Sequence, residues 1–106
     1  MIVTAWNNGK HYKSGAGYGL KIKIAGRDEN FFKDWGNIII YLEGFSNPFE
    51  VNINKLSFWS LDCRELINKD IGLWLLENKK APWPKGNPPK IKLEKIKDNI
   101  FEASFL

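Results

Sequence analysis

The strongest constraint on the fold is an alternation of apolar and polar side chains in several short segments. Between residues 18 and 24, every second side chain is large and apolar, while Lys21 and Lys23 occupy positions in between. A period of two puts successive side chains on opposite faces of a β-strand, so this segment predicts a half-buried strand with lysines toward solvent. Similar segments rich in β-branched residues predict further strands. The six predicted strands span residues 2–6, 18–24, 37–43, 49–54, 90–96 and 99–106.

Three local patterns refine this scheme. The unbroken apolar run Ile38–Leu42 predicts a strand that is buried on both faces and central in the sheet. Residues 26–30, GRDEN, are predicted to break the chain after the second strand, and residues 31–35 to form at most one helical turn. The pair Asp98-Asn99 predicts a hairpin turn between the last two strands.

One main helix is predicted over residues 62–79. Asp62 and Glu65 have the spacing of a capping box, which predicts the start of the helix. Apolar residues then recur at intervals of three and four, as expected for one buried helix face. Gly72 weakens the pattern, so we expect a kink or a break near it. The predicted face consists of Cys63, Leu66, Ile67, Ile71, Trp74 and Leu75.

Residues 81–89, APWPKGNPP, contain four of the five prolines and therefore predict neither a helix nor a central strand. We expect this segment to cross the surface in an extended conformation. Trp83, between Pro82 and Pro84, has two interpretations. It either packs as a lid over the end of the core, or it offers a stacking surface to a planar ligand.

These elements predict an α+β fold that is mainly β. We expect a single domain, residues 1–106, with about six antiparallel strands in a small barrel or a strongly bent sheet. The helix at about 62–79 would lie between the fourth and fifth strands.

Composition narrows the environment and the partners. The apolar and charged fractions, 43% and 26%, are those of soluble proteins, and the N-terminal residues lack the pattern of a secretory signal. A single cysteine is compatible with a reducing compartment, so we expect a cytoplasmic protein without membrane association. The net charge of +4 mildly favours anionic partners. Only Arg27 and Arg64 are arginines, which argues against sequence-specific reading of DNA bases.

The loop at residues 7–19, NNGKHYKSGAGYG, is the most conspicuous candidate for function. Closely spaced glycines allow backbone N–H groups to converge on an anion. A nucleotide-binding phosphate loop leads into a helix, whereas a strand is predicted on each side of this loop. Two interpretations remain: a functional anion-binding loop, or a long hairpin loop whose glycines meet backbone requirements.

Catalytic and metal chemistry find little support in the sequence. His11 is the only histidine, and Cys63 is expected to lie on the buried helix face, so no zinc site and no cofactor are predicted. The carboxylates show no spacing typical of a nuclease or a glycosidase. We therefore expect a binding protein rather than an enzyme.

The sequence favours a small binding module for an anionic ligand, with single-stranded nucleic acid as the leading candidate, because lysines and aromatic residues occur together in predicted loops and strands. The alternative is a protein-interaction or assembly module that self-associates through an edge strand and an exposed Trp83. The oligomeric state does not follow from the sequence. The candidate ligand-binding residues are Lys10, His11, Lys13, Ser14, Tyr18, Lys21, Lys23, Trp83 and Lys85.

Overall fold

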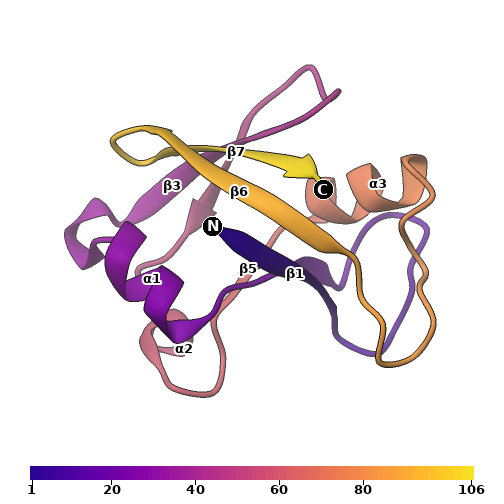
Figure 1. Ribbon diagram of the computed structural model, residues 1–106, viewed down its shortest axis with the longest axis horizontal. Coiled ribbons are helices and arrows are strands. Elements are labelled where there is room, and N and C mark those ends of the chain that lie inside the picture. Colours follow the sequence, from indigo (N-terminus) through magenta and orange to yellow (C-terminus); the bar gives the residue numbers. More distant parts are fainter.

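A computed structural model describes residues 1–106 and shows one sheet curled into a nearly closed barrel (Figure 1). The sheet has seven strands in the order β4-β3-β7-β6-β1-β2-β5, and β4 and β5 at its two ends also contact each other. The predicted mainly-β α+β barrel is confirmed, with one strand more than expected. The strands are β1 (Ile2–Asn7), β2 (Tyr18–Lys21), β3 (Asn37–Leu42), β4 (Phe49–Asn52), β5 (Glu65–Ile67), β6 (Lys90–Lys97) and β7 (Ile100–Phe105).

All strand pairs are antiparallel except β3 and β7, which run parallel with Ile39 opposite Ile100. The prediction that all strands are antiparallel is therefore wrong for this pair. Parallel neighbours require a long crossover connection, and the chain between β3 and β7 supplies it with five further elements of the fold and the proline-rich segment.

The barrel interior is filled by the apolar residues that alternate along the strands. β3 shows this clearly, because Ile38, Ile40 and Leu42 are buried while Tyr41 is 44% exposed. The prediction that this strand is buried on both faces is wrong: its apolar run has one face toward the core and the other toward solvent. The inward residues of the other strands include Val3, Ala5, Leu20, Val51, Leu66, Ile91, Leu93, Phe101 and Ala103.

The main helix, α3 (Lys69–Glu77), begins seven residues later than predicted. Asn68 caps it, because its side-chain oxygen accepts a hydrogen bond from the Asp70 backbone N–H at 2.8 Å. The preceding residues form β5, in which Leu66 pairs with Leu20 of β2. The predicted capping box is therefore wrong, and Cys63 is exposed rather than buried. The predicted core residues Ile71, Trp74 and Leu75 do lie in the core.

Gly72 has a specific packing role. The helix runs through this residue, so the expected break does not occur there. A Cβ atom at Gly72 would collide with the carbonyl group of Gly15 in the glycine-rich loop. The absence of a side chain at Gly72 thus lets α3 lie directly against this loop, and this contact helps to position the loop.

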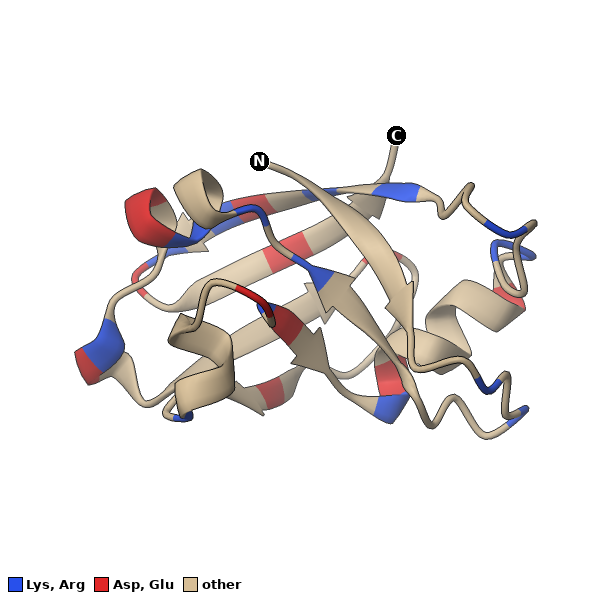
Figure 2. Ribbon diagram, turned by 90° about the horizontal axis from the view of Figure 1, so that it is seen from below, with Lys and Arg blue, Asp and Glu red and all other residues tan.

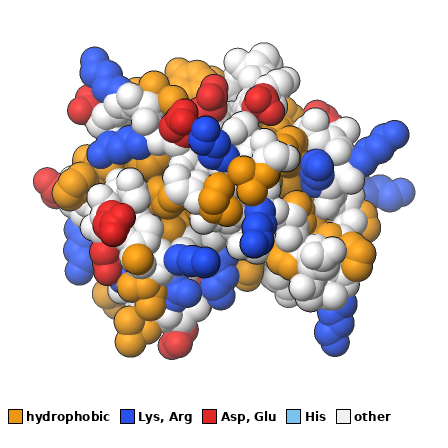
Figure 3. All heavy atoms as spheres, in the orientation of Figure 1, with side chains coloured by type: hydrophobic (Ala, Val, Ile, Leu, Met, Phe, Trp, Pro, Cys, Tyr) orange, Lys and Arg blue, Asp and Glu red, His pale blue; other side chains and the backbone are white.

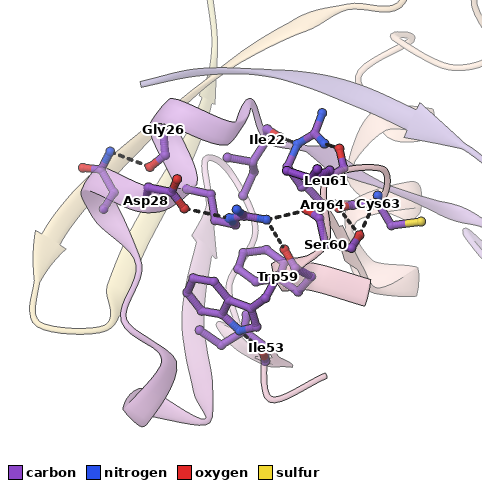
Figure 4. A network of polar contacts seen from close by, with 12 residues as sticks. Ile22, Gly26, Asp28, Ile53, Trp59, Ser60, Leu61, Cys63 and Arg64 are labelled. Atoms are coloured by element: carbon purple, nitrogen blue, oxygen red, sulfur yellow. Dashed lines mark hydrogen bonds and ion pairs between the residues drawn. The ribbon is translucent and has the colours of Figure 1, made fainter. Parts of the chain in front are cut away.

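A second helix, α1 (Ile24–Asn30), occupies the segment predicted to be the end of a strand and a turn. Its Arg27 is only 5% exposed and anchors the helix. Nη1 donates to the carbonyl groups of Phe58 at 3.1 Å and Ser60 at 2.6 Å, and Nε pairs with Asp28 at 3.0 Å. Figure 4 shows Asp28, Trp59 and Ser60 close together in this network of polar contacts. These distant contacts favour the helix over a continued strand.

Two short helical elements complete the fold. The 3₁₀ helix η1 (Lys33–Trp35) corresponds to the predicted helical turn. Helix α2 (Leu56–Trp59) follows β4 and was not predicted. As predicted, β6 and β7 form a hairpin, with Asp98 at a positive φ of 49° in the turn, and residues 81–89 form neither a helix nor a strand.

Candidate ligand-binding pocket

An open pocket of about 590 Å³ lies where the loop after β1 meets the proline-rich segment before β6. In Figure 1 these two stretches lie at the same end of the barrel, close to α3. The fold thus brings together the glycine-rich loop and the proline-rich segment, the two segments that the sequence had singled out. The pocket is lined by Ala5, Trp6, Asn7, Gly9, His11, Trp83, Lys85, Gly86 and Pro88.

The glycine-rich loop is shaped by its two asparagines. The side-chain oxygen of Asn7 accepts from Gly9 N at 2.8 Å, and its amide donates to the Lys10 carbonyl at 2.8 Å. The Asn8 side chain accepts from Lys10 N at 3.0 Å. Such side-chain to backbone hydrogen bonds form local turns. They place His11 at the pocket.

His11, Tyr18 and Trp83 form one contact cluster. Nδ1 of His11 lies 2.7 Å from the Tyr18 hydroxyl, and the Trp83 ring centroid lies 6.0 Å from His11 and 5.8 Å from Tyr18. Tyr18 is fully buried, and burial raises the pKa of its phenol. Tyr18 therefore supports the pocket from below, where the sequence had suggested direct contact with the ligand.

The proline-rich segment is held against β1. The backbone N–H of Ala5 donates to the Pro89 carbonyl at 2.9 Å, and Asn87 N donates to the Pro84 carbonyl at 3.0 Å, which closes a turn. Trp83 is half-buried, while Lys85 is exposed at the pocket wall. Both belong to the predicted site.

Several lysines extend the pocket along the outer face of the sheet. Thr4 of β1 pairs with Lys21 on one side and with Lys90 on the other. Lys92 lies opposite Ile2 on the same outward face. The strand spacing puts the backbones of Lys21 and Lys90 about 10 Å apart. The register thus puts Lys21, Lys90 and Lys92 on one outward face of the sheet.

The remaining predicted site residues do not line the pocket. Lys10, Lys13 and Ser14 are exposed on the glycine-rich loop outside it, and Lys23 precedes α1 beyond the end of β2. Conversely, Trp6 lines the pocket but is not among the residues predicted for the site. The alternation that predicted the first strand could have indicated this position, because Trp6 shares the outward face of β1 with Ile2 and Thr4.

Charge is distributed unevenly around this pocket. Residues 7–23 and 78–93 contain nine of the 16 basic residues and none of the 12 carboxylates. The rest of the chain has seven basic and twelve acidic residues, a net charge of −5. Blue lysine segments mark these loops at the right-hand end of Figure 2. Figure 3 shows lysine or arginine side chains among apolar ones across the face formed by β6 and β1.

A smaller pocket of about 240 Å³ lies elsewhere, lined by Lys33, Asn54, Lys55, Leu56 and Trp59. Its Leu56 is 91% exposed. No group of three or more His, Cys, Asp or Glu side chains is placed to hold a metal ion anywhere in the chain.

None of the helices has the length and apolar character needed to cross a bilayer. No family model, curated protein or solved structure matches this chain.

Proposed function

We propose that this protein is a non-enzymatic binding module for single-stranded nucleic acid. The observation that carries the proposal is the segregation of charge: both chain segments that build the larger pocket are rich in lysine and free of carboxylates, and two tryptophans line that pocket.

Each part of the pocket has a matching part in the ligand. A basic groove attracts the phosphate backbone, and aromatic side chains offer planar surfaces on which bases stack. Trp6 and Trp83 supply the aromatic surfaces, and Lys85 lies beside them. Lys21, Lys90 and Lys92 continue the positive charge along the sheet. The ligand would therefore place a base at the tryptophans and its backbone along the lysines.

A single strand fits this site better than a duplex. Bases in a duplex are stacked on each other and cannot stack on a side chain. The longest helix, α3, has nine residues and buries Ile71, Trp74 and Leu75, so it is not free to enter a major groove. The assembly alternative requires an exposed Trp83 and an open edge strand, whereas Trp83 is half-buried and the end strands β4 and β5 contact each other.

The proposal is tested by fluorescence anisotropy with labelled oligo-dT and oligo-U of about 12 nucleotides, a length within known site sizes. Binding is expected at low salt and should weaken about tenfold at moderate salt, because neutralised phosphates release counterions. Trp83→Ala should weaken binding, while Trp59→Phe, at the smaller pocket, should not. Absence of binding at low salt would refute the proposal. Equal competition by inorganic polyphosphate would show that charge alone, without base stacking, accounts for the binding.

A further inference from the structure

The free polar groups of the side chains that line the larger pocket are all hydrogen-bond donors. Neither the Trp6 nor the Trp83 indole N–H has a partner within the protein, in contrast to Trp59 and Trp74, which donate to the carbonyl groups of Ile53 and Glu43. Lys85 forms no ion pair. A pocket with this character selects for a ligand that brings acceptors.

His11 adds a donor because of its contact with Tyr18. The hydroxyl of Tyr18 is buried, and His11 Nδ1 at 2.7 Å is its only hydrogen-bond partner. A phenol that keeps its proton donates it, so Nδ1 is the acceptor and the imidazole proton resides on Nε2. Nε2 has no partner in the protein, and the ring lines the pocket. His11 therefore offers an N–H group to a ligand.

The acceptors of the lining side chains are already engaged. Asn7 has the only side-chain oxygen in the lining, and this oxygen accepts from Gly9 N at 2.8 Å. The lining contains no carboxylate and no hydroxyl group. An anion thus meets no repelling charge here, and a ligand that brings only donors would leave the pocket donors unpaired.

We propose that this pocket binds the phosphomonoester group of a nucleotide through His11 Nε2 and Lys85 Nζ, beside the stacking surfaces of Trp6 and Trp83. The proposal rests on the function proposed above. A phosphomonoester carries a charge of about −1.5 to −2 and three strong acceptor oxygens, more than a phosphodiester within a strand offers. The group is found at the phosphorylated end of a strand or on a free nucleotide.

The test compares oligo-U with a 5′-phosphate, with a 3′-phosphate and with hydroxyl groups at both ends. At least one phosphorylated form should bind about tenfold more tightly than the hydroxyl form, as expected for added charge-assisted hydrogen bonds. Competition by uridine monophosphate, uridine and inorganic phosphate then identifies the source. Strong competition by uridine monophosphate alone indicates a free nucleotide, and weak competition by all three indicates a strand end; both support the phosphomonoester.

Variants separate the pocket donors from general charge. His11→Ala and Lys85→Ala should abolish the preference for a phosphorylated end. Lys13→Ala, a loop lysine outside the pocket, should weaken all oligonucleotides equally and leave the preference intact. Tyr18→Phe keeps the buried ring but no longer fixes the imidazole proton, so it should reduce the preference while binding of the hydroxyl form persists. Circular dichroism confirms that each variant is folded.

Two results would overturn the inference, and they differ in what else they affect. Equal affinity for phosphorylated and hydroxyl ends would refute the phosphomonoester site and leave single-strand binding in place. Absence of binding by every oligonucleotide, and by uridine monophosphate, would refute both proposals together.

Discussion

The hydroxyl of Tyr18 lies 2.7 Å from Nδ1 of His11, and this contact joins the first residue of β2 to the exposed glycine-rich loop. Tyr18 is fully buried, whereas His11 lines the pocket. A core residue thus fixes the position of a side chain at the surface, which is how the loop between β1 and β2, residues 8–17, obtains a defined geometry at its ligand-facing side.

Removal of this hydroxyl should cost stability as well as loop order. Tyr18→Phe leaves Nδ1 of His11 without its donor, and we expect the free energy of unfolding to fall by about 1 kcal/mol. Urea denaturation measures the change. Tyr12→Phe is the matched control, because Tyr12 is exposed in the same loop and should show no loss. Equal effects of the two substitutions would contradict the assigned hydrogen bond.

Stability should also depend on pH in the alkaline range through Tyr18. Burial raises the pKa of Tyr18 in the folded protein above its ordinary value of 10.0. As pH rises, the unfolded chain therefore loses the Tyr18 proton before the folded protein does. The contribution of Tyr18 to the free energy of unfolding is complete below about pH 10 and is lost as pH rises through the folded pKa. Denaturation curves at several alkaline pH values measure this. Because lysines titrate in the same range, the difference between the wild type and Tyr18→Phe isolates the contribution, and parallel curves would argue against it.

Arg27 should be the most sensitive polar residue outside the pocket. Arg27→Ala removes a buried guanidinium that holds α1 to the carbonyl groups of Phe58 and Ser60, and we expect a loss of about 3 kcal/mol. Lys33 provides the control, since its Nζ lies 5.4 Å from the Trp59 ring centroid, much as the guanidinium of Arg27 lies at 5.5 Å. Lys33 is exposed, so Lys33→Ala should cost less than about 1 kcal/mol. A comparable loss in both variants, measured by thermal or chemical unfolding, would be inconsistent with the anchoring role.

Gly72→Ala should destabilise the protein although alanine is the better helix former. A Cβ atom at this position would collide with the Gly15 backbone, so α3 and the glycine-rich loop would have to separate. Overpacking of this kind costs about 1–3 kcal/mol, more than the gain of about 1 kcal/mol in helix propensity. Glu77→Ala, at the exposed end of the same helix, should be nearly neutral. A stabilised Gly72→Ala variant would show that the helix does not need this close approach.

The sequence predicts the parts of the fold that depend on local patterns. Alternation identified strands such as residues 49–54, and the turn pair Asp98-Asn99 identified the β6–β7 hairpin. The errors arise where distant pairing decides between two local options. Leu66 fits a helical spacing as well as a strand, and its pairing with Leu20 selects the strand. Residues 24–30 become helical where Arg27 can reach Phe58 and Ser60.

The candidate site was likewise predicted where local composition indicates it and missed where the three-dimensional arrangement decides. Loop composition pointed to His11, Trp83 and Lys85, which the structure places on one pocket. Trp6 was missed because a tryptophan in a strand is as readily assigned to the core as to the surface; in the structure Val3 and Ala5 are the buried residues of β1, so Trp6 lies on the outward face. Lys10 and Lys13 share the composition of the loop, but neither of them lines the pocket.

The most direct test of nucleic-acid binding at this pocket uses the five tryptophans as reporters. Each indole N–H gives its own signal in an ¹H–¹⁵N correlation spectrum, and single Trp→Phe variants assign the signals. On titration with oligo-U at low salt, we expect the signals of Trp6 and Trp83 to shift, while those of Trp59 and Trp74, whose N–H groups are hydrogen-bonded within the protein, remain unchanged. Shifts confined to Trp35 or Trp59, or no shift at all, would contradict a nucleic-acid site at this pocket.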